Sequence, residues 1–263
     1  MELASLTQKV TSIAKEVGAF IREERLSFNH ERIEYKGLND LVSYVDKTAE
    51  VQLVASLSKL IPSAGFITEE KTINKVGEHY NWIIDPLDGT TNFIHGIPAF
   101  AISIALQSND KLVLGVVYEI NRDECFYAWE NGGAYLNGNV IQTSKITHLS
   151  TTLLATGFPY YDFRKQAPYL KLFQELMQKC HGLRRIGSAA VDLAYVACGR
   201  FDGYFEYNLN SWDVAAGIVI VREAGGRVTD FSGEKQPIEL REIVATNAHI
   251  SIQLLGIIHE YFK

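Results

Sequence analysis

The chain has 263 residues, 47% of them hydrophobic and 21% charged, which is the composition of an ordinary globular protein. Its net charge of −6 argues against a general affinity for nucleic-acid backbones. No run comes close to the roughly 18 apolar residues of a membrane span, and the N-terminus lacks the order of a signal peptide. Three separated cysteines without a Cys-x-x-Cys pair predict reduced thiols and a cytoplasmic protein.

The first half of the chain is predicted to be rich in strands, after two helices. Apolar residues at helical spacing mark both helices, and short apolar runs bounded by Gly, Asn and Asp mark the strands and turns. In chain order we expect helices over 3–24 and from Asp46 to Pro62, strands over 66–68 and 82–84, two or three strands between Phe100 and Tyr127, and turns at 108–111, 131–133 and 137–138.

Strands and helices are predicted to alternate in the second half. We expect strands over 152–156, 182–186, 204–207, 227–230 and 243–245, and helices over 166–179, 188–198, 212–224 and 248–262. Ser188 is the expected N-cap of its helix, and Gly199 follows that helix. This order predicts layered sheets with helices between and around them. We expect one compact unit made of an N-terminal subdomain (1–145), which carries most acidic candidates, and a C-terminal subdomain (146–263).

Six carboxylates fall where predicted strands end or predicted helices begin. A carboxylate at such a place is held on rigid backbone and faces a crevice. Converging carboxylates repel one another unless metal cations neutralise them, and ligation by oxygen alone favours Mg²⁺ first and Mn²⁺ second. The six are Asp46, Glu69, Glu70, Asp85, Asp88 and Asp213.

The run Asp85–Thr91 combines features of a metal site and a phosphate site. Pro86 is expected to turn the chain out of the strand, so that both aspartates face one pocket and the Leu87 carbonyl is left as a neutral ligand. Gly89 permits close approach of the backbone, and Thr90 begins a short helix whose N–H groups would hold a phosphate. The alternative is an ordinary Asp-Gly turn.

The other candidates also have structural interpretations. Glu69 and Glu70 could be a solvated pair, Asp46 a helix cap, and Asp213 the N-cap of a helix over 214–224. The small residues of 187–190 indicate either tight helix packing or a substrate wall. Arg184 and Arg185 form a small basic patch that is usually a solvated face. The spacings of zinc hydrolases, serine hydrolases and P-loop enzymes do not occur.

Five segments, in order and spacing, resemble the inositol monophosphatase family over nearly the whole chain. The longest, 82–93, has the sequence Trp-Ile-Ile-Asp-Pro-Leu-Asp-Gly-Thr-Thr-Asn-Phe, and 212–217 has the sequence Trp-Asp-Val-Ala-Ala-Gly. The others are 39–46, 67–70 and 187–190, and the segment 155–160 is of the bacterial type. The resemblance implies the layered αβαβα sandwich of the inositol monophosphatase and fructose-1,6-bisphosphatase type of sugar phosphatase. It also implies a homodimer, two or three Mg²⁺ ions and inhibition by Li⁺.

The resemblance further implies a role for each matching residue. The implied metal ligands are Glu69, Asp85, the Leu87 carbonyl, Asp88 and Asp213. Asp46, Glu69 and Thr90 would orient and deprotonate the attacking water, with Glu70 behind them. Gly89 and Thr90 would hold the phosphate, and the implied contacts to the polyol are Asp88, Gly187, Ser188, Ala189, Glu206 and Asp213.

The implied activity is hydrolysis of a phosphate monoester, as in an inositol-phosphate phosphatase. Asn210, where animal inositol enzymes often have His, and the loop 157–165 depart from the animal pattern on the alcohol side of the pocket. The motifs favour a myo-inositol-like monophosphate over fructose-1,6-bisphosphate, histidinol phosphate, an adenosine bisphosphate or NADP. An alternative hypothesis is that the protein is not an enzyme but a regulatory partner of nucleic-acid machinery, which it binds through Arg184 and Arg185.

Overall fold

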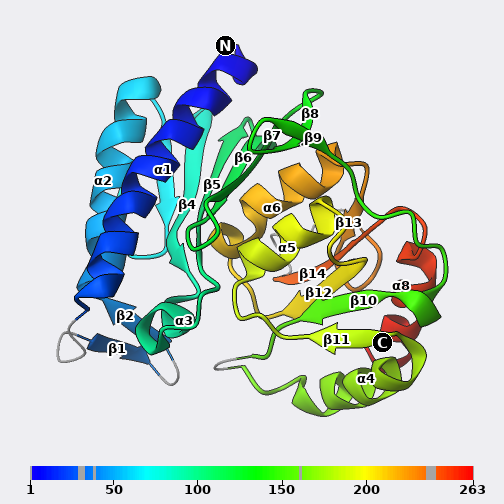
Figure 1. The fold of residues 1–263 in the computed structure, drawn as a ribbon. Helices are drawn as coiled ribbons and strands as arrows, with labels where there is room; N and C mark the ends of the chain where they lie inside the picture. Colours follow the sequence, from blue (N-terminus) through cyan, green and yellow to red (C-terminus); the bar gives the residue numbers. More distant parts are fainter. Residues whose placement is uncertain (1, 29–32, 38–39, 160–161, 235–240, 263) are drawn as a thin grey trace.

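The computed structural model describes residues 2–28, 33–37, 40–159, 162–234 and 241–262 (Figure 1). Among the motif residues named above, Asn39 and Tyr160 lie outside this part of the chain, as does Tyr161 of the loop 157–165. A small antiparallel sheet of β1 (Ile33–Gly37) and β2 (Asp40–Ser43) precedes the second helix. No helix among the described residues is both long and apolar enough to cross a membrane.

A seven-stranded sheet forms from strands that follow one another along the chain, and its order is β3-β4-β5-β6-β7-β8-β9. The first pair is parallel and all later pairs are antiparallel. Its strands are β3 (Gly65–Thr68), β4 (Tyr80–Asp88), β5 (Ala101–Ser108), β6 (Lys111–Glu119), β7 (Glu124–Trp129), β8 (Gly133–Leu136) and β9 (Asn139–Ile141).

Both faces of this sheet are buried, because alternate side chains of its central strands enter different cores. Trp82 and Ile84 of β4 pack under α1 (Leu3–Leu26) and α2 (Tyr44–Leu60), whereas Ile83 between them packs toward the second half of the chain. In Figure 1 the two helices, drawn in blue, cover one face of the sheet.

The second sheet is mixed, with the order β11-β10-β12-β14-β13. Its strands are β10 (Leu153–Thr156), β11 (Gly182–Arg184), β12 (Gly203–Tyr207), β13 (Arg227–Thr229) and β14 (Glu242–Thr246). Helices α5 (Ala189–Ala197) and α6 (Ser211–Glu223) lie between the two sheets, and α4 (Gln166–Lys179) and α8 (Ser251–Tyr261) cover the outer face (Figure 1). The predicted αβαβα sandwich is therefore confirmed.

Two local predictions at helix starts and one at a strand end were wrong. Helix α6 begins at Ser211 with Asn210 as its N-cap, so Asp213 is the third helical residue rather than the cap. Helix α2 begins at Tyr44 with Ser43 as its N-cap, and Asp46 reaches back to that cap. Strand β4 does not end at Asp85, because it continues to Asp88 through an irregularity in its pairing with β5.

Close packing of α6 on β6 makes a glycine essential to stability. A Cβ atom on Gly115 would collide with the backbone of Ala216, which cannot rotate away. We expect Gly115→Ala to lower the free energy of unfolding by about 1–3 kcal/mol, because overpacking forces the helix off the sheet. Urea denaturation measures this change.

The matched control is Gly256→Ala in α8, where a new Cβ would meet nothing within 4 Å. Alanine there should raise the free energy of unfolding by about 0.5–1 kcal/mol, because it restricts the unfolded chain. Equal effects of the two substitutions would contradict the packing described for α6 and β6.

Candidate active site

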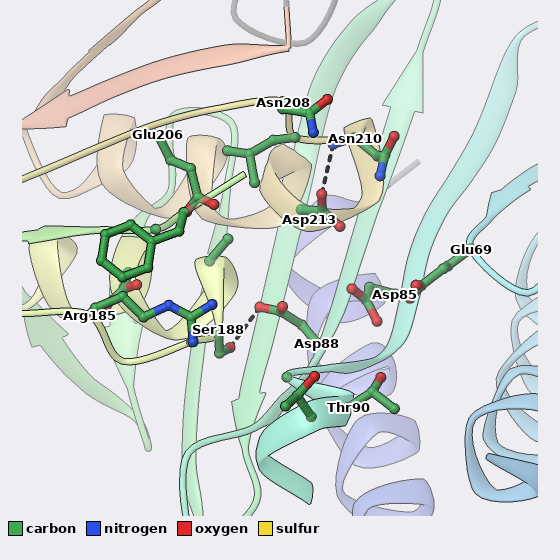
Figure 2. A pocket seen from close by; sticks show the side chains of 18 of the residues that line it. Glu69, Asp85, Asp88, Thr90, Arg185, Ser188, Glu206, Asn208, Asn210 and Asp213 are labelled. Carbon is green, nitrogen blue, oxygen red and sulfur yellow. Dashed lines mark hydrogen bonds between the residues drawn. The ribbon is translucent and has the colours of Figure 1, made fainter. Parts of the chain in front are cut away.

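One pocket collects residues from both halves of the chain (Figure 2). They come from the end of β3, from β4 and the start of α3 (Thr90–His95), from the N-termini of α5 and α6, and from the end of β12. In Figure 2 the carboxylates of Glu69, Asp85, Asp88 and Asp213 point toward a common space. The lining residues include Glu69, Asp85, Leu87, Asp88, Gly89, Thr90, Gly187, Ser188, Ala189, Glu206 and Asp213.

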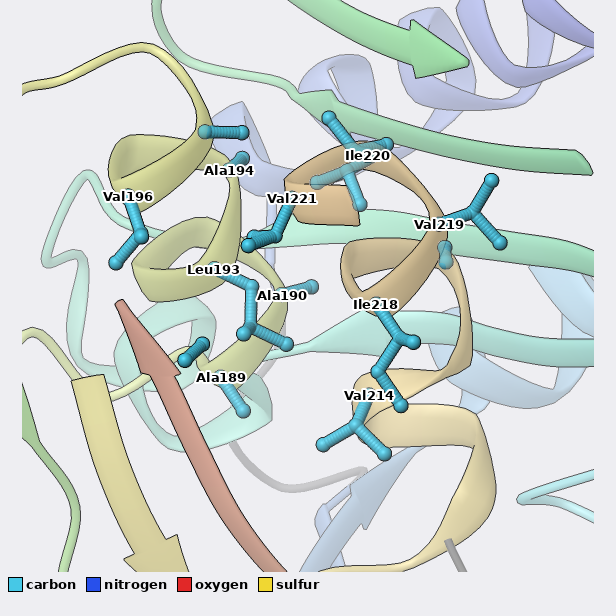
Figure 3. Close-up of a cluster of buried hydrophobic side chains, with 14 of the residues drawn as sticks. Ala189, Ala190, Leu193, Ala194, Val196, Val214, Ile218, Val219, Ile220 and Val221 are labelled. Carbon is cyan, nitrogen blue, oxygen red and sulfur yellow. The ribbon is translucent and has the colours of Figure 1, made fainter. Parts of the chain in front are cut away.

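Helix packing fixes the elements that present these groups. The facing sides of α5 and α6 form an apolar cluster in which Leu193 of α5 lies against Gly217 of α6 (Figure 3). Ile218 and Val221 belong to the same buried cluster. Because both helices begin at the pocket, this cluster positions the side chains of their first turns.

Thr90 and Asp46 form a hydrogen-bonded pair at one side of the pocket. Thr90 Oγ1 lies 2.8 Å from Asp46 Oδ1 and 3.1 Å from the Leu87 carbonyl oxygen. The other carboxylate oxygen of Asp46 accepts bonds from the backbone N–H and the hydroxyl of Ser43, at 2.9 and 2.6 Å. Burial raises the pKa of Asp46, and the bonds from Ser43 and Thr90 oppose that rise.

Asp85 is buried and Asp213 is half-buried, and both acids face like charges. Burial, followed by repulsion from Glu69, Asp88 and Asp213, raises the pKa of Asp85 well above its ordinary value. Burial and repulsion from Asp88 and Glu69 do the same to the pKa of Asp213. The backbone N–H of Leu87 donates to Asp85 at 2.9 Å, and that of Asn210 donates to Asp213 at 2.7 Å. These bonds fix the two side chains but do not offset the repulsion.

Asp88 connects β4 to the N-terminus of α5. One of its oxygens accepts a bond from the Ser188 hydroxyl and one from the Ala190 N–H, both 2.6 Å long. Ser188 also caps α5, as predicted. Burial raises the pKa of Asp88 to about 6, against the lowering effect of these two bonds and of Arg185.

The paired acids after β3 are separated by the fold. Glu69 is partly exposed and lines the pocket, whereas Glu70 is not among the lining residues. The Glu69 N–H donates to the Ile84 carbonyl at 3.3 Å, which ties the end of β3 to β4. The Glu70 N–H donates to Glu50 at 2.7 Å. Only Glu69 is therefore placed to meet a ligand directly.

Glycines at the pocket adopt backbone conformations that other residues avoid. Gly89 has φ +98 and caps α3, and a Cβ there would lie 3.0 Å from the Ala99 carbonyl oxygen. Gly187 has φ +94 immediately before the Ser188 cap. Both positions bring backbone close to the pocket, and the phosphate and alcohol contacts expected there stay a prediction.

The side of the pocket next to Glu206, where the alcohol was predicted to bind, contains residues that the sequence did not single out as site residues. Arg185 was predicted to lie on a solvated face, but it lines the pocket with its guanidinium 5.7 Å from the centre of the Phe158 ring. Arg184 beside it is exposed, as predicted. Asp192 also lines the pocket and is 1% exposed. No local pattern reveals these positions, because the groups they face come from other elements.

Glu206 is buried at the same side and accepts a bond from the Tyr204 hydroxyl. Burial raises the pKa of Glu206 to about 7, although the bond from Tyr204 and the charge of Arg185 oppose that rise. Burial, and then repulsion from Glu206 and Asp88, raises the pKa of Asp192 well above its ordinary value. The alcohol side thus combines two buried carboxyl groups with one guanidinium.

The donor set suits a hard metal cation. The candidate donors are the Leu87 carbonyl and four of the six carboxylates that line the pocket, those of Glu69, Asp85, Asp88 and Asp213. Oxygen donors of this kind are the ligands that Mg²⁺ and Mn²⁺ prefer. Among the described residues, no group of three or more His, Cys, Asp or Glu side chains already has the spacing needed to hold a metal ion. Burial and then repulsion from neighbouring acids raise the pKa of Asp85, and the repulsion is the second indication of fit, because a cation would relieve it.

The layered sandwich and its oxygen-rich pocket define a fold of the sugar phosphatase class. More specifically, the chain belongs to the inositol monophosphatase family, whose model matches residues 2–261. Enzymes of this family are generally metal-dependent, and membership supports a phosphatase.

Individual relatives are similar over most of their length. The inositol-1-monophosphatase of Mesorhizobium japonicum is 38% identical over 256 residues, which are 97% of this chain and 96% of that protein. The putative Nus factor SuhB of Neisseria meningitidis serogroup B is 45% identical over 224 residues, 85% of this chain and 86% of that protein. A crystal structure of the extragenic suppressor protein suhB from Bartonella henselae has a TM-score of 0.92 at 40% identity and covers 97% of this chain and 98% of that one.

Proposed function

We propose that this protein is a magnesium-dependent phosphomonoesterase that hydrolyses myo-inositol monophosphate, or a similar polyol phosphate, to the alcohol and inorganic phosphate. The observation that carries the proposal is the convergence of Glu69, Asp85, Asp88 and Asp213 on one pocket next to the Gly89 turn. Carboxylates would repel a phosphate, so their position beside an anion site makes chemical sense when cations lie between them.

The reaction is an in-line attack of water on the phosphorus atom. Bound Mg²⁺ would neutralise the phosphoryl oxygens, lower the pKa of the attacking water and stabilise the departing alkoxide. Glu69, Asp85, Asp88, Asp213 and the Leu87 carbonyl would hold the ions.

Residues of the chain would carry out the proton transfer, orient the water and bind the phosphate. The Thr90 hydroxyl donates a hydrogen bond to Asp46. It would accept a proton from the attacking water while its own proton moves to the Asp46 carboxylate. Glu69 would orient the same water from the opposite side. Backbone amides of Gly89 and Thr90, at the N-terminus of α3, would bind the phosphate oxygens and their growing charge.

The hydrogen-bonding groups of the alcohol side favour a neutral polyol. Glu206 and Asp192 would offer their carboxyl groups to substrate hydroxyl groups, and Arg185 lines the same part of the pocket. A second phosphate, as in fructose-1,6-bisphosphate or an adenosine bisphosphate, would face both of these acids. We therefore favour the inositol-like substrate over the bisphosphates and NADP.

Gly157→Ala tests the contact between Glu206 and the alcohol. A Cβ on Gly157 would overlap the carboxylate of Glu206 and displace it. We expect KM for inositol 1-phosphate to rise about tenfold with a smaller change in kcat, since the lost contact acts on the ground state and the transition state alike. For p-nitrophenyl phosphate, whose alcohol has no such hydroxyl groups, KM should stay the same. An equal rise for both substrates would contradict this role of Glu206.

A screen of phosphate release tests the proposed function. The substrates are inositol 1-phosphate, fructose-1,6-bisphosphate, histidinol phosphate, an adenosine bisphosphate and NADP, each with Mg²⁺. The highest kcat/KM should belong to inositol 1-phosphate. A preference for a bisphosphate would support the proposed phosphatase reaction but reject inositol phosphate as its substrate. No phosphate release from any of these compounds would reject the proposed function.

Three further properties belong to the same proposal. We propose inhibition by Li⁺ and a homodimer, both on the resemblance to the family. We propose a cytoplasmic location, which agrees with the three free cysteines among the described residues. Mn²⁺ would be the substitute metal.

A second function rests on the names of relatives. The relative in Escherichia coli is called Nus factor SuhB, and the one in Neisseria meningitidis is called putative Nus factor SuhB. We propose a regulatory association with nucleic-acid machinery as the alternative, with Arg184 as the accessible half of the basic patch, since Arg185 lies in the pocket. Binding to RNA that weakens steeply with salt, and is lost in Arg184→Ala with phosphate release intact, would support it. Absence of binding at low salt would reject it.

A further inference from the structure

Glu50 is a buried acid in α2 whose two carboxylate oxygens both accept hydrogen bonds from the segment 68–72. It is 0% exposed, and its donors lie 18–22 residues further along the chain, at the last residue of β3 and in the turn that follows it. Oε1 accepts bonds from the Thr68 hydroxyl at 2.9 Å and from both the N–H and the hydroxyl of Thr72 at 2.7 Å. Oε2 accepts the Glu70 N–H at 2.7 Å.

The turn that Glu50 holds is strained at its centre. Lys71 has φ +54, a left-handed conformation that a residue with a side chain rarely adopts. The two N–H groups on either side of Lys71 both donate to Glu50, so the carboxylate spans the strained residue. Such strain persists where the surroundings determine the backbone from several directions, and functional sites are where it is usually found.

Glu69 lies within this bonded segment, between the donors Thr68 and Glu70, and it lines the pocket. Its own N–H is fixed to Ile84 of β4, so the backbone is held on both sides of its Cα atom. Glu50 stands four residues after Asp46 in α2, and side chains at this spacing share one side of a helix. One helix therefore fixes Thr90 through Asp46 and the Glu69 turn through Glu50.

We propose that Glu50 is a positioning residue that holds Glu69 at its place in the pocket, so that α2 sets the separation between Glu69 and Thr90. The role in turnover rests on the proposed function, whereas the clamp on the turn does not. Glu50 itself touches neither water nor substrate. Its effect on the reaction passes entirely through the backbone of 68–72.

Glu50→Gln is the sharpest test, because glutamine keeps the shape and loses one acceptor. The amide oxygen can satisfy the three donors on the Thr68 and Thr72 side, which leaves its NH₂ group opposite the Glu70 N–H. We expect hydrogen exchange of the Glu70 amide to accelerate at least tenfold while that of the Thr72 amide changes little. We expect kcat to fall by roughly ten- to a hundredfold with KM nearly constant, as for groups that orient a ligand.

The matched control is Leu57→Ala, a buried position in the same helix whose side chain belongs to the apolar core under the sheet. It should lower Tm and leave kcat and the exchange of the Glu70 amide within about twofold of the wild type, since only packing is lost. If Leu57→Ala lowers kcat as much as Glu50→Gln does, Glu50 has only a structural role and the proposal is overturned. Unchanged kcat in Glu50→Gln beside an active wild type overturns it as well.

Thr72→Val serves if Glu50→Gln does not fold. It removes a single hydroxyl donor from the same carboxylate and keeps the side-chain shape. We expect kcat to fall severalfold, with a matching loss in Mg²⁺ affinity by calorimetric titration of the metal-free protein. Wild-type kcat and Mg²⁺ affinity in Thr72→Val would overturn the proposal. A wild type that releases no phosphate would reject the proposed function instead, and amide exchange would still decide whether Glu50 holds the turn.

Discussion

Asp88→Asn should lower kcat for inositol 1-phosphate by roughly a hundredfold or more while the protein still folds. Substituting groups that merely orient a metal ligand already costs about 10–100-fold, and Asp88 is a proposed ligand. Asparagine can still accept the Ala190 N–H, which lies 2.6 Å from Asp88, so the link between β4 and α5 is expected to persist. Steady-state kinetics and circular dichroism of the same preparation measure both effects.

Asp110→Asn is the control for Asp88→Asn. Asp110 lies in the exposed hairpin between β5 and β6 with φ +63, a conformation that asparagine tolerates. It makes the same chemical change far from the pocket, and its kcat should match the wild type. A fully active, Mg²⁺-dependent Asp88→Asn enzyme would contradict the assignment of the metal site.

Asp46→Asn and Thr90→Val should each lower kcat by roughly 10²–10⁴-fold, the usual contribution of a group that moves a proton in the transition state. The two side chains are joined by a 2.8 Å hydrogen bond and are proposed to act on the water as one unit. Groups that act as a unit are not additive, so the double variant should be no slower than the slower single variant. KM should change little in all three.

The two single effects could instead multiply in the double variant, and that result would contradict a shared role. Asp46 also accepts a bond from the Ser43 N–H at the start of α2, so any effect of Asp46→Asn on stability must be measured separately from its effect on kcat. Thermal unfolding measures that effect on stability. Since Thr90→Val leaves the cap intact, loss of kcat in both variants cannot be attributed to capping.

Most elements could be predicted because their signals are local. Helix α4 occupies the predicted residues 166–179, and Ser188 caps α5 as its position before a small, apolar run indicates. The turn over 108–111 joins two expected strands. The turns over 131–133 and 137–138 were also predicted, but they lead into β8 and β9, two strands that were not predicted. The division of the chain near residue 145 into two subdomains stays a prediction.

The errors arose where two local signals competed or where the partner is distant. Asn210 and Asp213 can both cap a helix, and the sequence does not decide between them, so the cap was placed three residues late. Pro86 does not end β4, because the pairing with β5 slips between Asp85 and Asp88 and the strand then resumes.

Long-range contacts explain the site residues that sequence reasoning missed. A lone glutamate on a helix, such as Glu50, looks solvated until the turn containing its donors is known. Arg185 looked like a surface charge beside Arg184, and only the fold brings it against Phe158. The acids were singled out because each was predicted to lie at an element end, which is a local property of the sequence, although Asp85 in fact lies inside β4.

The most direct test of the central claim is phosphate release from inositol 1-phosphate before and after removal of divalent metal. The purified protein is dialysed against EDTA, assayed, and assayed again after Mg²⁺ is added in excess. We predict loss of activity with the chelator and full recovery with Mg²⁺, with no recovery in Asp88→Asn. Phosphate release that continues undiminished in EDTA would contradict the claim that these carboxylates act through a metal ion.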